Sequence, residues 1–283
     1  MQKKNSIDAI YQPILPYLTR VQRNIRREIR VENKTVSKIV DYLFQAKGKL
    51  LRPALTILAG KAVARGEDEA SDEALVQLAT AIELIHNASL VHDDILDDAD
   101  LRREIPTLNK IYNNHVALLA GDVLFTEAFY LMTHSLRQEI IEPITKITSG
   151  MCQGELINEL YPGDNLDFHT YLTVISLKTA GLMSGATQAG AKVFDAPQEV
   201  VEALGEYGRN VGLAYQIVDD YVDDETGSIE GFSLDYAFKA AEQARDSLKV
   251  LSSSIYKDKL LDIVDLFIEM AVQKDMSATV KLP

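Results

Sequence analysis

The stretch EALVQLATAIELIHNASLVHDDIL, residues 73–96, decides the fold. Its apolar residues recur at spacings of three and four, which places one continuous apolar stripe along a helix. The stripe covers much of the circumference, and therefore predicts a helix buried in the middle of a large bundle. Ser71 and Asp72 stand just before the pattern and are the predicted N-cap.

The same helical period governs most of the chain. Further helices are predicted over residues 116–134, 140–160, 167–193, 197–222, 233–251 and 255–274. Alternation of apolar and polar residues over the length of a strand is nearly absent. The Gly and Pro breaks at 161–163 and 195–197 are typical of connections between helices. We therefore predict an all-α fold in a single domain over residues 1–283.

Composition narrows the class of protein. The chain is 47% apolar and 25% charged, as in soluble globular proteins. A formal net charge of -13 argues against a nucleic-acid partner. The single cysteine, Cys152, excludes an internal disulfide and fits a reducing compartment. Because the start lacks a signal-peptide pattern and no stretch approaches the ~20 apolar residues of a transmembrane helix, we expect a cytoplasmic protein, with peripheral membrane contact left open.

Two acidic clusters end two of the most apolar predicted helices. In each, DDILD at 93–97 and DDYVD at 219–223, the first and last aspartates are four residues apart and share a helix face. Like charges beside an apolar core need a counter-charge, and ligand sets made only of oxygen favour Mg²⁺. One such cluster is as easily a solvated helix end, whereas two copies favour a metal site. The predicted metal ligands are Asp93, Asp94, Asp97, Asp219, Asp220 and Asp223.

Basic residues stand near these clusters in the sequence. Lys49 and Arg52 lie in GKLLRP, the pair Arg102–Arg103 follows the first cluster, and Lys178 interrupts an apolar run. Any one of them alone reads as an ordinary surface charge. Together with metal-binding carboxylates they indicate two anion sites, one bridged by metal and one directly basic.

Six motifs then carry a resemblance to a known family. They are GKLLRP, ELIHNASLVHDDILD, LRREIPT, LLAGDVLF, SLKTAGL and GLAYQIVDDYVDD, in order between about residues 40 and 224. In this order and spacing the chain resembles the trans-isoprenyl diphosphate synthases, or polyprenyl synthetases. The resemblance implies an all-α bundle around a deep central cavity, a homodimer, and three Mg²⁺ ions when diphosphate is bound.

The resemblance also implies a reaction and a role for each matching residue. An allylic diphosphate ionises, isopentenyl diphosphate attacks the cation, and a proton is lost. The catalytic residues it implies are Asp93, Asp97, Arg102, Lys178 and Asp219. Those that hold the allylic diphosphate are Arg102, Lys178, Thr179 and Gln216. Those that hold isopentenyl diphosphate are Lys49, Arg52, His86 and Arg103.

The resemblance also implies that product length depends on the residues just before the first cluster. Ala88 and Ser89 are small where short-chain members of the family usually carry an aromatic floor, and Ile85 lies one turn deeper. The resemblance therefore implies an open tunnel and a product longer than twenty carbons. For Ile85, simple core packing is the alternative.

The chain departs from the family pattern in two places. Glu104 stands where the family commonly has glycine. Near 225–231 several tens of expected residues, including a diphosphate-binding lysine, are missing; either this deletion is real or the sequence omits a mobile loop. A real deletion would favour a non-catalytic or partner-dependent subunit of a heteromeric synthase. A class I terpene cyclase is a weaker alternative, because it has no second substrate for GKLLRP and Arg102–Arg103 to hold.

Overall fold

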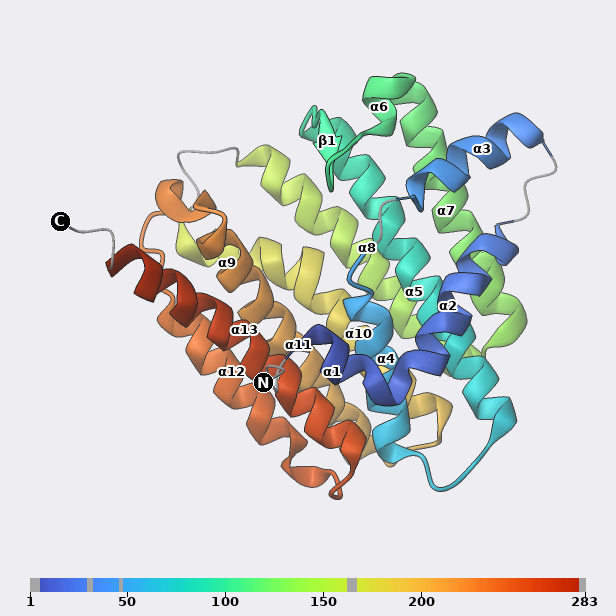
Figure 1. The fold of residues 1–283 in the computed structure, drawn as a ribbon, viewed down its shortest axis with the longest axis vertical. Helices are drawn as coiled ribbons and strands as arrows, with labels where there is room; N and C mark the ends of the chain where they lie inside the picture. Colours follow the sequence, from blue (N-terminus) through green and yellow to red (C-terminus); the bar gives the residue numbers. More distant parts are fainter. Residues whose placement is uncertain (1–5, 30–32, 46–47, 162–166, 280–283) are drawn as a thin grey trace.

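Long helices make up nearly all the regular structure of this chain (Figure 1). The structure is a computed structural model and describes residues 6–29, 33–45, 48–161 and 167–279. The helices are α1 (Ile7–Tyr11), α2 (Leu15–Glu28), α3 (Lys34–Leu43), α4 (Leu51–Val63), α5 (Glu69–Leu96), α6 (Leu108–Ile111), α7 (Asn114–Ser135), α8 (Gln138–Leu160), α9 (Phe168–Ile175), α10 (Gly181–Val193), α11 (Gln198–Val222), α12 (Asp235–Ser247) and α13 (Ile255–Thr279). Shorter turns are η1 (Gln12–Ile14), η2 (Ser176–Ala180), η3 (Glu225–Ser228) and η4 (Leu248–Val250), and one hairpin pairs β1 (Leu101–Arg102) with β2 (Ile105–Pro106).

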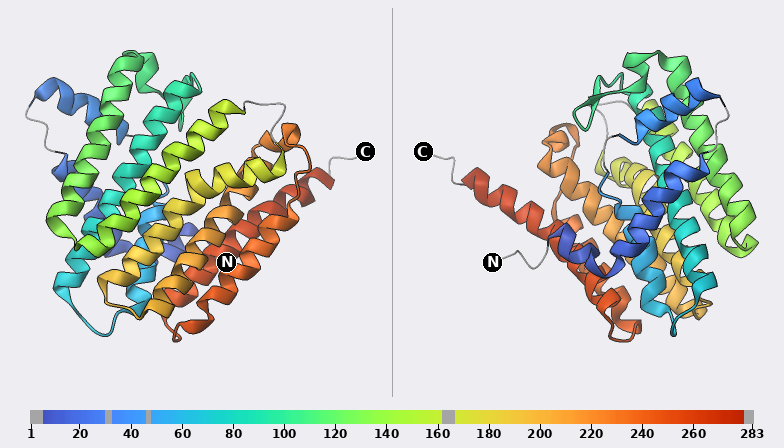
Figure 2. Two further views of the ribbon diagram at one scale, coloured as in Figure 1. Left: turned by 180° about the vertical axis from the view of Figure 1, so that it is seen from behind. Right: turned by 45° about the vertical axis from the view of Figure 1, so that its right-hand side comes forward.

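The all-α prediction is confirmed, and α5 is the buried helix that its apolar stripe predicted. Leu78, Ile82 and Ile85 are fully buried, and one core cluster joins α5 to residues from α1 through α13. Helix α11 contributes Leu204, Tyr207 and Val211 to the same core, and α12 and α13 pack against it. Figure 2 shows α9, α11, α12 and α13 side by side. Every helix expected beyond residue 73 is present, close to its predicted bounds.

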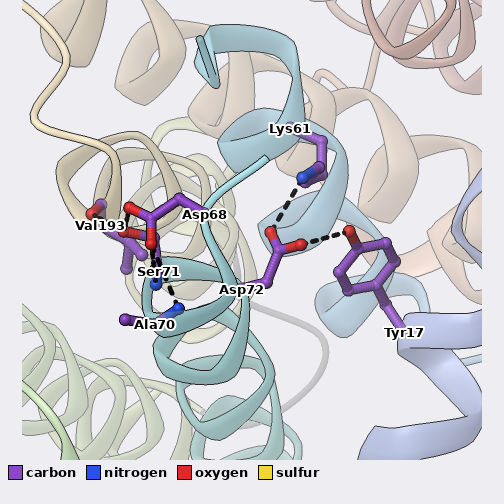
Figure 3. A network of polar contacts seen from close by, with 7 residues as sticks. All are labelled: Tyr17, Lys61, Asp68, Ala70, Ser71, Asp72 and Val193. Atoms are coloured by element: carbon purple, nitrogen blue, oxygen red, sulfur yellow. Dashed lines mark hydrogen bonds and ion pairs between the residues drawn. The ribbon is translucent and has the colours of Figure 1, made fainter. Parts of the chain in front are cut away.

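The predicted N-cap of α5 is wrong, and its partners explain why (Figure 3). The cap is Asp68, whose carboxylate accepts from the backbone N–H groups of Ala70 and Ser71. Asp72 lies inside the helix, where it accepts from Lys61 Nζ at 2.8 Å and from the Tyr17 hydroxyl at 2.7 Å. These contacts hold α2 and α4 against the start of α5, at the end remote from the aspartates.

Two helices, α5 and α7, are long and apolar enough to cross a membrane by length and composition. The sequence-based expectation of no such stretch does not hold by this measure. For α5 the bundle itself gives the reason, since 72% of its apolar window is buried. For α7 only 39% is buried, and Leu118, Leu119 and Tyr130 are exposed on it.

The C-terminal ends of α5 and α11 lie towards the same end of the bundle (Figure 1). The β1–β2 hairpin follows α5 there, and the η3 connection follows α11. This arrangement brings the two acidic clusters, which are far apart in sequence, to one region. The prediction of one domain with a deletion near 225–231 stays a prediction; the connection from α11 to α12 runs from Asp223 to Leu234.

Candidate active site

A cavity of about 880 Å³ opens between the ends of α5, α8, α9 and α11. Asp93 and Asp97 line it from α5, and Asp219 and Asp220 line it from α11. The predicted pairing of two acidic walls is therefore found in the described part of the chain. Asp94 and Asp223 are not among the lining residues.

The first wall combines a buried carboxylate with one at the helix end. Burial raises the pKa of Asp93 to about 6; Lys178 opposes that rise, whereas Glu155 and Asp97 add to it. Asp97 is the exposed C-cap residue of α5. Asp94 does not line the cavity and instead forms an ion pair with Arg102. The Nε of Arg102 donates to Oδ1 of Asp94 at 2.6 Å. Arg102 also lines the cavity, so Asp94 orients a side chain expected to bind diphosphate.

The second wall is held by a chain of hydrogen bonds. Asp220 accepts from the Tyr171 hydroxyl and from Gln216 Nε2, both at 2.6 Å. Gln216 in turn accepts from the Thr179 hydroxyl at 3.0 Å. Burial raises the pKa of both Asp219 and Asp220. The hydrogen bonds and the nearby lysines, Lys49 and Lys178, only partly offset the effect of burial on these carboxylates.

Lys178 lies between the two walls, on an unusual turn of helix. Residues Ser176–Ala180 form a single π-helical turn between α9 and α10, a feature frequent at functional sites. Glu155 of α8 forms an ion pair with Lys178 Nζ, and Lys178 lowers the pKa of both Asp93 and Asp220. Gly154 permits this approach, because a Cβ there would lie 2.8 Å from Leu177 Cβ and 3.1 Å from Lys178 Cγ.

A second basic group gathers beside α5. Arg52 Nη1 and His86 Nε2 are 2.9 Å apart, and the Arg103 guanidinium lies so close to Gly48 that a Cβ there would be 2.8 Å from its Nη1. Lys49 is exposed and lowers the pKa of Asp219. Burial and the nearby arginines hold the pKa of His86 well below its usual range, so the imidazole is neutral at pH 7. Of the four residues expected to hold isopentenyl diphosphate, Arg52, His86 and Arg103 line the cavity. Lys49 is not among the lining residues and acts on Asp219 of the second wall.

A buried carboxyl lies beneath this basic group. Glu83 is 4% exposed, and burial raises its pKa to about 7, against the opposing effect of Arg52. The Nε of Arg52 is buried and has no hydrogen-bond partner within the part of the chain that the structure describes. A basic group with an unsatisfied buried donor fits an anionic ligand.

The three predicted chain-length residues separate into two groups. Ser89 lines the cavity, whereas Ala88 and Ile85 are fully buried in the core behind it. The position of Ile85 therefore agrees with the alternative interpretation, that this residue only packs in the core. Phe125 of α7 supplies apolar lining instead.

Among the lining residues that sequence reasoning missed are Glu155, Tyr171, Tyr215 and Glu225. Tyr215 lies one turn before Asp219 and hydrogen-bonds to it, so the i, i+4 spacing was a usable signal. Glu155 shares a helix face with Met151, Asn158 and other lining residues of α8, but only the fold shows that this face meets a cavity.

Glu104 occupies a turn position whose backbone conformation favours glycine. Arg103 and Glu104 form the two-residue turn of the hairpin, with φ of 52° and 68°. A turn with positive φ at both central residues favours glycine, most of all at the second. The hairpin therefore forms despite a strained residue, and it still places Arg103 beside Gly48.

The acidic walls fit divalent cations by their chemistry. Each presents a carboxyl whose pKa is raised first by burial and then by neighbouring carboxylates, against the opposing effect of a lysine. Within the described ranges, no group of three or more His, Cys, Asp or Glu side chains is already arranged to hold a metal ion. Ions bound here would need further oxygen ligands from water or a diphosphate, which is how Mg²⁺ is usually held.

The chain is similar to proteins that make or transfer prenyl groups. The sequence profile described as "Polyprenyl synthetase" matches residues 33–228. A prenyl transferase of Synechocystis sp. is 34% identical over 219 residues, which cover 77% of this chain and 67% of that protein. Heptaprenyl diphosphate synthase component 2 of Geobacillus stearothermophilus is 35% identical, with the same coverage of 77% and 67%. The solved structure of a decaprenyl diphosphate synthase from Rhodobacter capsulatus is 27% identical, with a TM-score of 0.82 over 94% of this chain and 99% of that one.

Proposed function

Because this chain belongs to the polyprenyl synthetase family, we propose that it is a Mg²⁺-dependent prenyltransferase that condenses an allylic diphosphate with isopentenyl diphosphate. The observation that carries the proposal is the cavity itself. It has two walls of aspartates with raised pKa and a separate basic group beside them. One anion would be bound through metal and the other directly.

Bound Mg²⁺ would neutralise the diphosphate and make it a better leaving group. Asp93 and Asp97 would bind the Mg²⁺ from α5, and Asp219 and Asp220 would bind it from α11. Asp223 is the C-cap residue of α11 and does not line the cavity. As a metal ligand it would bind at the edge of the site. Three ions, as the family resemblance implies, are part of the proposal.

The side chains of this chain would then position the two substrates. Arg102, held by Asp94, and Lys178 would bind the allylic diphosphate, and Thr179 and Gln216 would keep the second wall in place. The C–O bond of the allylic diphosphate breaks, and the leaving diphosphate keeps the electron pair. The double bond of isopentenyl diphosphate forms the new C–C bond, and the released diphosphate accepts the proton.

Lys49, Arg52, His86 and Arg103 would hold isopentenyl diphosphate without metal. A neutral His86 can accept from Arg52 and still donate to an anion. Apolar lining from Leu90, Phe125 and Met151 would exclude water from the cation.

We propose a product longer than twenty carbons. Ser89 leaves the α5 side of the cavity without an aromatic barrier, although Phe125 narrows the α7 side. The names of the two long-chain relatives agree with this proposal, as does the resemblance.

We also propose that the chain pairs with a second copy of itself through α7. The support is the apolar surface of Leu118, Leu119 and Tyr130, which the described part of the chain leaves exposed. A partner-dependent subunit is the alternative, supported by the relative named as a synthase component. A cytoplasmic location stays a prediction from the sequence.

The test is incorporation of radiolabelled isopentenyl diphosphate into farnesyl diphosphate, with and without Mg²⁺, followed by separation of products by chain length. Metal-dependent products longer than twenty carbons are expected. No incorporation by the protein alone, with activity appearing on addition of a partner subunit, would favour the alternative.

A further inference from the structure

Lys274, in the last turns of α13, contacts the end of α11 that carries the second acidic cluster. Its Nζ donates to the backbone carbonyl oxygens of Tyr221 and Val222, the latter at 2.9 Å. It also donates to Asp224 Oδ1 at 2.5 Å and lies 4.9 Å from the centre of the Tyr221 ring. Since α11 ends at Val222, these carbonyls belong to its last turn, where few backbone donors remain; the Tyr221 carbonyl also accepts from the backbone N–H of Asp224 at 3.4 Å.

This end of α11 is strongly acidic. Asp219, Asp220, Asp223, Asp224 and Glu225 fall within seven residues. Burial and mutual repulsion raise the pKa of Asp219, Asp220 and Glu225. The helix dipole adds further negative potential at a C-terminus. A cation that binds the last carbonyls therefore opposes the forces that would fray this turn.

The connection after α11 depends on the same contact. Asp224 adopts the left-handed conformation, with φ of 63°, and is the N-cap residue of η3. The next residue, Glu225, lines the cavity. Besides burial, the charges of Asp220 and Asp219 and of Asp97 on the opposite wall raise its pKa. By holding Asp224, Lys274 fixes the point at which the chain leaves the second wall and enters this short connection.

Lys274 is not among the residues that line the cavity, so a direct contact with substrate is not its role. We propose that Lys274 is a positioning residue for the second aspartate wall, acting through the cap of α11. This inference rests on the proposed metal–diphosphate site and goes beyond it, because it assigns to α13 a task in forming that site.

The test compares Lys274→Met with Lys274→Arg and with a matched control, Lys259→Met. Lys259 is on the same helix, forms an ion pair with Asp262 and has a side-chain exposure of 19%, against 21% for Lys274. Two quantities are measured in the full chain. One is hydrogen exchange of the backbone amides in the last turn of α11, and the other is Mn²⁺ binding by EPR in the presence of inorganic pyrophosphate.

The sign of the change separates positioning from a simple charge effect. Loss of one positive charge beside a cation site would by itself tighten Mn²⁺ binding. Loss of the cap should instead weaken it, by about three- to tenfold, with faster exchange in the last turn of α11. Lys274→Arg should keep most of the affinity, and Lys259→Met should match the wild type.

Unchanged or tighter Mn²⁺ binding in Lys274→Met would overturn the positioning role while leaving the proposed function intact. If the wild type bound no Mn²⁺ with pyrophosphate, the metal site would fail and the role of Lys274 with it. Equal exchange rates in wild type and Lys274→Met would show that the capping contact does not hold the turn, and would also overturn the proposal.

Discussion

Replacing Asp93 by asparagine should stabilise the ligand-free protein and abolish turnover. Burial raises the pKa of this carboxyl from 3.8 to about 6. A rise of about 2 pKa units, at about 1.4 kcal/mol per unit, corresponds to ~3 kcal/mol when the group is ionised. Asparagine at this position would have nearly the same volume without the charge, so at pH 8 we expect a gain of ~2–3 kcal/mol in the free energy of unfolding.

The pH dependence follows from the direction of the shift. Between pH 3.8 and about 6 the folded state keeps a proton on Asp93 that the unfolded chain has lost, so wild-type stability falls as the pH rises. Asp93→Asn lacks this dependence. The difference between the two proteins should therefore be largest above pH 6 and should vanish near pH 3.8 and below.

Urea denaturation at pH 4, 6 and 8 measures this difference directly. Asp98→Asn is the control, because Asp98 is a nearby aspartate with 81% side-chain exposure and an ion pair to Lys110. Its removal should change stability by less than ~1 kcal/mol, and in the opposite direction. If Asp93→Asn were no more stable than the wild type at pH 8, the account of an uncompensated buried charge would be refuted.

Three further changes test separate parts of the site. Glu104→Gly should raise stability by ~1 kcal/mol in thermal denaturation, because glycine removes the cost of a positive φ; no gain would mean that the turn is not strained. Gly154→Ala should cost ~1–3 kcal/mol and lower turnover, because the added methyl would displace Lys178; wild-type kinetics would contradict that packing. Tyr171→Phe removes a hydrogen bond to ionised Asp220 and should raise the pKa of that carboxyl. The acidic limb of the pH–rate profile should therefore move to higher pH, and an unchanged profile would show that ionisation of Asp220 does not control the rate.

Helix positions and the two acidic walls could be predicted because each depends on local spacing. The period of three and four along residues 73–96 reports burial. The i, i+4 spacing identifies the lining pair Asp93 and Asp97 on α5, whereas on α11 the adjacent Asp219 and Asp220 line the cavity and Asp223 does not. The cap of α5 was misplaced by a few residues because Ser71, Asp72 and Asp68 are all good capping residues. Contacts to Lys61 and Tyr17 occupy Asp72, and such contacts between helices leave no mark in the local pattern.

The remaining features of the site come from contacts between helices. The π-helical turn at Lys178 is accommodated by Gly154 of another helix. The Glu155–Lys178 pair joins residues that are 23 positions apart, and Lys274 reaches α11 from the far end of the sequence. No spacing rule within one helix identifies such pairs.

Binding of inorganic pyrophosphate, measured calorimetrically with and without Mg²⁺, tests the central claim most directly. The claim is that carboxylates of α5 and α11 act together on one metal-bound diphosphate. Wild-type protein should bind pyrophosphate far more tightly with Mg²⁺ than without it, and either Asp93→Asn or Asp219→Asn alone should remove most of that gain. Equal binding without metal, or full Mg²⁺-dependent binding in Asp219→Asn, would contradict a site shared by the two walls.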